Sequence, residues 1–99
     1  MDKWLYAMFI ERGKNYNKMT KAVADRHVEN IRKLDDEGHL EYCGIFRGYP
    51  GMAGMLILSA ESIEAAKELC KREPLVIEGY AKYKLVEIKE ANRENNYLW

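Results

Sequence analysis

Residues 17–38 read NKMTKAVADRHVENIRKLDDEG, and the pattern in this stretch decides the fold. Five of its side chains recur at intervals of three and four residues, which is the spacing of one helical face. They are Met19, Val23, His27, Ile31 and Leu34. Gly38 stands where a left-handed residue often ends a helix. The stretch therefore predicts a single long helix over residues 17–38.

His27 is the unusual member of this face, because a leucine would pack better among apolar neighbours. An imidazole held in such a place has its proton affinity set by the protein rather than by water. Two interpretations stay open. His27 is either a core residue whose ring bonds a backbone carbonyl, which the pattern alone favours, or a group with a chemical role.

Strand and turn signals place the rest of the chain around this helix. Residues 4–11, WLYAMFIE, are almost continuously apolar, which is typical of a strand covered on both faces. A turn containing Pro50 and Gly51 joins two later strands, and Ser62 caps a second helix that Pro74 ends. The predicted strands cover residues 4–11, 40–46, 52–59 and 80–88, and the predicted helices cover 17–38 and 63–72, with 75–79 as a connection.

This order, β-α-β-β-α-β, predicts an α+β ferredoxin-like fold with a four-stranded antiparallel sheet. Both helices would cover one face of the sheet and leave the other bare. The alternative to a second copy on that face is a large apolar patch in water. We therefore expect a homodimer that closes a dimeric α/β barrel across a two-fold axis.

Ninety-nine residues predict one domain over residues 1–99. Residues 89–99 form a polar tail that closes with Tyr97-Leu98-Trp99. Burying one large apolar side chain is worth roughly 1.5–3 kcal/mol. We therefore expect the tail to dock on the domain or on its dimer partner.

The charge balance narrows the range of partners. Sixteen basic residues face sixteen acidic ones, whereas a nucleic-acid partner needs a basic face, so we expect neither nucleic acid nor an anionic membrane surface. No apolar run approaches the roughly 20 residues of a membrane span. Met1-Asp2-Lys3 leads straight into a strand-like run, which predicts no signal peptide and a cytoplasmic protein.

Few residues are left to carry chemistry. No catalytic triad, phosphate loop or dinucleotide fingerprint is present, and Cys43 and Cys70 lack metal-ligand spacing, so we expect no metal and no cofactor. The two cysteines are predicted to be buried thiols in a reducing compartment, with a disulfide as the alternative. His39 follows Gly38 in a turn and is predicted to be exposed.

Glu73 is the carboxylate of most interest, because Pro74 fixes it at the end of the second helix. The two helices of this fold lie side by side, so Glu73 could reach His27. The pattern alone favours a plainer interpretation, in which Glu73 is an exposed carboxylate at a helix end.

Two groups of motifs bear on this choice. The run HVENIRKL at residues 27–34, followed by GHL at 38–40 and Gly44, resembles the H-L-x-x-L…G-x-L…G signature of the YCII-related family. The run SIEAAK at residues 62–67, followed by EPLV at 73–76, resembles that family's S-L-E-E-A…D-P-F-V segment. The similarity extends from about the first strand to the fourth.

The resemblance implies a dimeric α/β barrel with a histidine–aspartate centre in a pocket, and at least one family member is a dehydrochlorinase of a chlorinated hydroxyhydroquinone. The family histidine corresponds to His27, and the family aspartate to Glu73, which keeps the charge and adds a methylene. A carboxylate on one ring nitrogen would fix the tautomer, so that the other nitrogen can take or give a proton and the pair titrates as a unit.

Two functions follow from these observations. The first is a small cofactor-free enzyme with lyase- or isomerase-like acid–base chemistry on a small cyclic or aromatic compound, with His27 and Glu73 as its catalytic pair. The second is a non-catalytic dimeric module that binds a small ligand or regulates a partner. The first requires His27 to line a solvent-reachable pocket within hydrogen-bond distance of Glu73, whereas the second would seal His27 in the core.

Overall fold

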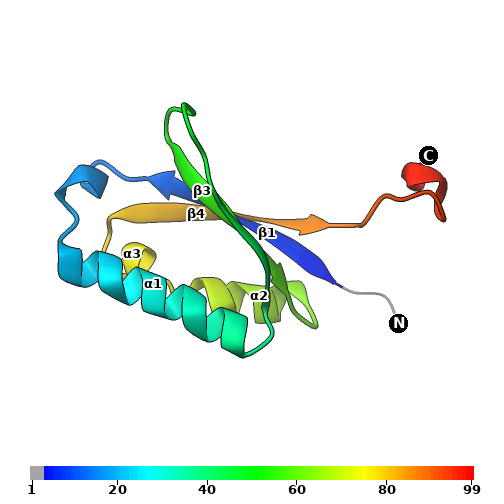
Figure 1. Cartoon of the computed structure of the whole chain (residues 1–99), viewed down its shortest axis with the longest axis horizontal. Helices are drawn as coiled ribbons and strands as arrows, with labels where there is room; N and C mark the ends of the chain where they lie inside the picture. Colours follow the sequence, from blue (N-terminus) through cyan, green and yellow to red (C-terminus); the bar gives the residue numbers. More distant parts are fainter. Residues whose placement is uncertain (1–3) are drawn as a thin grey trace.

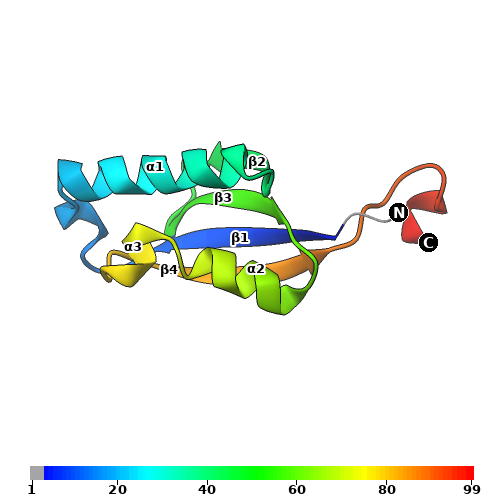
Figure 2. The same ribbon diagram turned by 90° about the horizontal axis from the view of Figure 1, so that it is seen from below.

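The computed structural model describes residues 4–99, which form a four-stranded antiparallel sheet and three α-helices (Figure 1). The strand order is β2-β3-β1-β4. Both views place the helices on the same face of the sheet (Figures 1 and 2). The elements are β1 Leu5–Arg12, a 3₁₀ turn Tyr16–Lys18, α1 Lys21–Asp36, β2 Leu40–Ile45, β3 Met52–Ser59, α2 Ile63–Cys70, α3 Pro74–Ile77, β4 Ala81–Ile88 and a second 3₁₀ turn Asn96–Leu98. The predicted α+β ferredoxin-like fold is confirmed.

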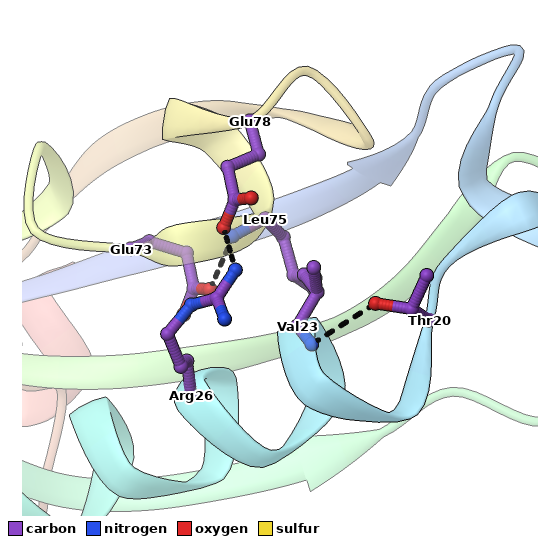
Figure 3. A network of polar contacts seen from close by, with 6 residues as sticks. All are labelled: Thr20, Val23, Arg26, Glu73, Leu75 and Glu78. Atoms are coloured by element: carbon purple, nitrogen blue, oxygen red, sulfur yellow. Dashed lines mark hydrogen bonds and ion pairs between the residues drawn. The ribbon is translucent and has the colours of Figure 1, made fainter.

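The predicted helix over residues 17–38 starts later than expected. Thr20 is the N-cap of α1, and its hydroxyl accepts a hydrogen bond from the Val23 N–H at 3.3 Å (Figure 3). Threonine is a favoured cap, and the backbone of Met19 is extended, with φ −57° and ψ 132°. At the other end, Gly38 has φ +80° and the His39 N–H donates to the Leu34 carbonyl, which is the glycine termination predicted.

One face of β1 builds the core between sheet and helices. Met8 and Ile10 are buried against α1 and α2, and Met8 lies opposite Leu56 on β3 and Leu85 on β4. Burial of each such side chain is worth about 1.5–3 kcal/mol. Side chains alternate on β4, where Ala81, Tyr83 and Leu85 are more buried than the lysines between them. The α-helical contributions to this core include Val23, Leu34, Leu69, Cys70 and Leu75.

The opposite face of the sheet is apolar, and no helix of residues 4–99 covers it (Figure 1). Phe9 lies on this face opposite Met55, and Ala7 lies opposite Ile57 and Val86. On the edge strand β2, Tyr42 is opposite Ile57 and is 59% exposed. The one-sided sheet from which a dimer was expected is therefore present.

Several predictions are wrong in detail. The second helix ends at Cys70 rather than residue 72, and the predicted connection over residues 75–79 contains α3, because Pro74 fits the first position of a helix. Cys43 is exposed rather than buried, because β2 is an edge strand; both cysteines are free, and Cys70 is buried as predicted. His39 is half-buried rather than exposed, with its Nδ1 3.0 Å from the Ser59 carbonyl oxygen.

The tail does not dock on its own domain. It leaves β4 and extends away from the sheet (Figure 1), and Trp99 is fully exposed while Tyr97 is 61% exposed. Its polar contacts are local, such as those between Asn92 and Asn95. Docking on a second copy stays a prediction.

Two expectations concern membranes and export. Within residues 4–99, none of the helices has the length and apolar character needed to cross a membrane. Met1-Asp2-Lys3, on which the expectation about a signal peptide rests, lies outside the described residues.

Candidate active site

Glu73 is held at the junction of α2 and α3. It is the N-cap residue of α3, with Pro74 in the first helical position, and its Oε2 accepts a hydrogen bond from the Leu75 N–H at 2.9 Å (Figure 3). The residue is only 1% exposed. The plainer interpretation of Glu73 as an exposed helix-end charge is therefore wrong. A buried carboxylate needs compensating donors, and the Leu75 N–H supplies one of them.

The second donor comes from the middle of α1. His27 Nδ1 lies 2.8 Å from Glu73 Oε1. An ionised carboxylate can only accept hydrogen bonds, so this contact places the proton of a neutral imidazole on Nδ1 and leaves Nε2 as the acceptor. The His27 side chain is 22% exposed, whereas that of Glu73 is 2% exposed. The imidazole is thus fixed at its buried end without being sealed in the core.

A second contact ties the same two elements together. Arg26 of α1 donates to Glu78, the residue that ends α3, at 2.6 Å (Figure 3). Both side chains are substantially exposed, so this ion pair contributes at most about 1 kcal/mol. It nevertheless lies next to His27 in sequence and restrains the separation of α1 and α3, on which the His27–Glu73 contact depends.

Cys43, on strand β2, lies close enough to Glu73 to feel the charge of its carboxylate. Its register opposite Leu56, a core residue, directs it to the helix side of the sheet. Partial burial of the thiol raises the pKa of Cys43 above its usual value, and the negative charge of Glu73 raises it further. Cys43 is therefore a neutral thiol at neutral pH, although the residue as a whole is exposed.

Two cavities among residues 4–99 bear on the site, and His27 lines neither of them, so neither is the pocket expected around this histidine. The larger, of about 470 Å³, lies at the β2–β3 hairpin. The smaller, of about 220 Å³, lies between α1 and the α2–α3 junction, beside the pair, and includes Pro74. Asn30, one helical turn from His27, also lines it. Within residues 4–99, no group of three or more histidine, cysteine or acidic side chains is arranged to hold a metal ion.

The structure thus brings together the two predicted site residues and adds features that the sequence did not reveal. No pattern in the sequence indicated that Arg26 would pair with Glu78, because the two are far apart along the chain. The hairpin cavity had a signal in Phe46 and Tyr49, aromatic residues on either side of Gly48 and just before the turn at Pro50 and Gly51. The cap role of Glu73 also had a signal in the sequence, because Pro74 follows it and proline favours the first position of a helix.

Fold and site together define a small ferredoxin-like domain with a histidine–glutamate pair between its first and third helices. The family model of the YCII-related domain matches residues 4–90, and the chain belongs to this family. The predicted family is confirmed, and the tail beyond residue 90 lies outside the match. No curated protein matches the sequence at a significant level.

A solved structure is similar to the chain over nearly its whole length. It is the 5-chloro-2-hydroxyhydroquinone dehydrochlorinase TftG from Burkholderia phenoliruptrix AC1100, in complex with 2,5-dihydroxybenzoquinone. The TM-score is 0.71 at 15% sequence identity, and the similarity covers 93% of this chain and 99% of that one. At this identity the likeness establishes the shared fold.

Proposed function

We propose that the protein is a small cytoplasmic enzyme that moves protons on a small cyclic or aromatic compound, with His27 as general acid or base and Glu73 as its orienting partner. One observation carries the proposal. The imidazole is held at 2.8 Å by a carboxylate that is itself almost fully buried, while part of the ring still reaches solvent. A core histidine would need neither the buried charge nor the access.

The chemistry follows from the geometry. With Nδ1–H donating to Glu73, Nε2 is free to accept a proton from a substrate carbon next to a carbonyl. The electron pair of the broken C–H bond then either expels a leaving group from the adjacent carbon, which is an elimination, or returns to a proton at another carbon, which is an isomerisation. Glu73 stabilises the imidazolium that forms, and a well-placed general base typically contributes about 10²–10⁴-fold to the rate. These steps need no cofactor.

One comparison supports the proposed enzyme, and the bare face of the sheet supports a homodimer, which we propose as well. The similar structure is that of an enzyme acting on a chlorinated hydroxyhydroquinone, and it holds a quinone, which is a small cyclic compound of the proposed class. The bare apolar face, with Tyr42 and Val86 at least half exposed, favours a homodimer. Two such sheets packed face to face, about 10 Å apart, would bury it.

The test is turnover of a panel of hydroxylated and chlorinated aromatics and quinones, followed by ultraviolet absorbance and by chloride release. The wild type is compared with His27→Gln and with the matched control His39→Gln, since His39 is the other histidine of the chain and bonds only a backbone carbonyl. We expect His27→Gln to lower the rate at least 100-fold while His39→Gln retains it. Equal rates in all three proteins would remove His27 from the mechanism.

One observation favours the second candidate, a non-catalytic module that binds a small ligand. The larger cavity is lined by aromatic and apolar side chains and does not include His27. Ligand binding measured by thermal shift that survives His27→Gln but is lost when Phe46 is replaced by alanine, with no turnover of any compound, would favour this candidate.

A further inference from the structure

We propose that the tail of one protomer docks in the hairpin groove of its partner, with Tyr97, Leu98 and Trp99 filling the cavity between β1 and the β2–β3 turn. The inference rests on the homodimer proposed above but not on catalysis. It gives a role to residues beyond the part that matches the family model.

The tail ends in large apolar side chains that remain exposed to solvent, which is typical of a segment that docks on another surface. Tyr97, Leu98 and Trp99 are 61%, 42% and 102% exposed, and nothing in their own domain covers them. Glu94, a few residues before them, forms no hydrogen bond or ion pair with any other described residue. A site that binds these three apolar side chains and the unpaired carboxylate should therefore be apolar and have a cation next to it.

The hairpin groove has this chemistry. Its walls are aromatic and apolar apart from Arg47, and the rings of Phe9 and Phe46 lie 6.3 Å apart and those of Phe46 and Tyr49 lie 6.2 Å apart. Ile45 is 85% exposed at its rim. Arg47 also lines the groove and pairs with no carboxylate among residues 4–99, so it can meet Glu94. The volume of about 470 Å³ lies in the range of pockets that take small molecules or large side chains.

The strand register indicates a partner's groove rather than the protomer's own. Ile88, where the tail begins, lies opposite Leu5, whereas the Arg12 N–H donates to Gly51 in the hairpin turn. The tail and the hairpin turn are therefore at opposite ends of β1, about 23 Å apart along the strand at 3.3 Å per residue. To reach its own groove, the tail would have to run back across the face that a second copy is expected to cover.

In a dimer, the tail can reach the partner's groove without crossing the sheet face. This requires a two-fold axis that runs between two facing sheets and is perpendicular to the strands. It places the tail end of one sheet over the hairpin end of the other, at the roughly 10 Å spacing of packed sheets. Residues 89–96 extend up to about 27 Å, which is enough to bridge that gap. Each protomer would then complete the groove of the other.

Trp99 supplies the assay. The chain has two tryptophans, Trp4 and Trp99, so a Trp4→Phe protein reports on Trp99 alone. Light scattering measures the mass at the same concentrations. We expect the Trp99 emission to shift to shorter wavelength, and iodide quenching to fall, as dimer forms. Ile45→Asp or Arg47→Glu should abolish the shift, and Glu94→Arg should restore it in the Arg47→Glu protein.

Mixing two variants distinguishes a partner's groove from the protomer's own. The first carries Trp4→Phe and Ile45→Asp and keeps its tail; the second carries Trp4→Phe, keeps its groove and lacks residues 97–99. A blue shift that returns only on mixing supports docking on the partner. A shift that persists in the Ile45→Asp protein alone, or fails to return on mixing, overturns the proposal.

The remaining outcomes separate this inference from the proposed function. A dimer by light scattering in which Trp99 stays exposed overturns the docking proposal and leaves the groove to another ligand, while the homodimer stands. A monomer at all concentrations overturns both the homodimer and the docking. Loss of turnover in a His27 variant bears on neither.

Discussion

Replacement of Glu73 by glutamine tests the site most directly, because the side chain keeps its shape and loses its charge. Both carboxylate oxygens are in use: Oε1 faces His27 Nδ1 at 2.8 Å, and Oε2 accepts from the Leu75 N–H at 2.9 Å. A glutamine has one acceptor oxygen and one donor NH₂ group. If its oxygen caps α3, its NH₂ group faces Nδ1, and the imidazole must move its proton to Nε2 to accept that hydrogen bond.

The expected loss of stability follows from these contacts. A hydrogen bond to a charged group is worth about 1.5–3 kcal/mol, and breaking a fully buried ion pair costs about 3–5 kcal/mol. The histidine is partly exposed and can reverse its tautomer, so we expect a loss of about 2 kcal/mol. For a domain of this size, that loss corresponds to a fall in Tm of roughly 8–16 °C.

Urea unfolding at a fixed protein concentration measures the free-energy change, and ¹⁵N-correlated NMR of the imidazole reads the tautomer and the titration of His27. The matched control is Glu78→Gln, which removes an exposed carboxylate from the other end of α3 and should cost less than about 1 kcal/mol. We expect only Glu73→Gln to move the proton to Nε2 and to alter the titration. The His27–Glu73 contact is contradicted if His27 keeps its tautomer and titration in the Glu73→Gln protein, or if both variants lose the same stability.

Four other predictions address the pair, the assembly and the thiols. His27→Leu should cost about 1–3 kcal/mol of stability in urea unfolding, because Glu73 keeps its buried charge and loses a hydrogen-bond donor. The double variant with Glu73→Gln should lose less stability than the sum of the two single variants, and additive losses would argue against direct contact. Light scattering at micromolar concentration should give about twice the 11.6 kDa chain mass, whereas a mass near 11.6 kDa would contradict the homodimer. Burial raises the pKa of the Cys70 thiol to about 11 from 9.0, so a thiol reagent at pH 8 should label Cys43 much faster than Cys70 in the native protein, and both cysteines equally in urea. Since the unfolded thiol ionises first, stability should also fall as pH rises from about 9 to 11, and a Cys70→Ala protein should lack that fall.

The fold was predictable because its main elements carry strong local signals. The face from Val23 to Leu34, the cap at Ser62 and the alternation on β4 each specify one element without reference to the others. Element ends were harder, since Met19 fits the helical spacing of α1 yet precedes its cap. A helix of four residues such as α3 has too few positions to show a period.

What the sequence could not supply were properties that depend on neighbours in space. Cys43 looked like a core residue within an apolar strand, and its exposure follows from the position of β2 at the edge of the sheet. The exposure of Trp99 likewise depends on the direction in which the tail leaves β4. The pairing of His27 with Glu73 was anticipated mainly through the family resemblance, because no periodicity links residues 46 positions apart.

The two oxygens of Glu73 determine how any result on this site must be interpreted. Helix caps are usually short side chains such as serine, threonine, aspartate or asparagine, whose single polar group serves the backbone alone. Here one oxygen caps α3 and the other reaches His27. A loss of stability or of turnover in a Glu73 variant could therefore arise from the cap without any role for the pair. The tautomer of His27 depends on Oε1 and not on the cap, so it is the measurement that separates a residue that builds α3 from one that orients a catalytic histidine.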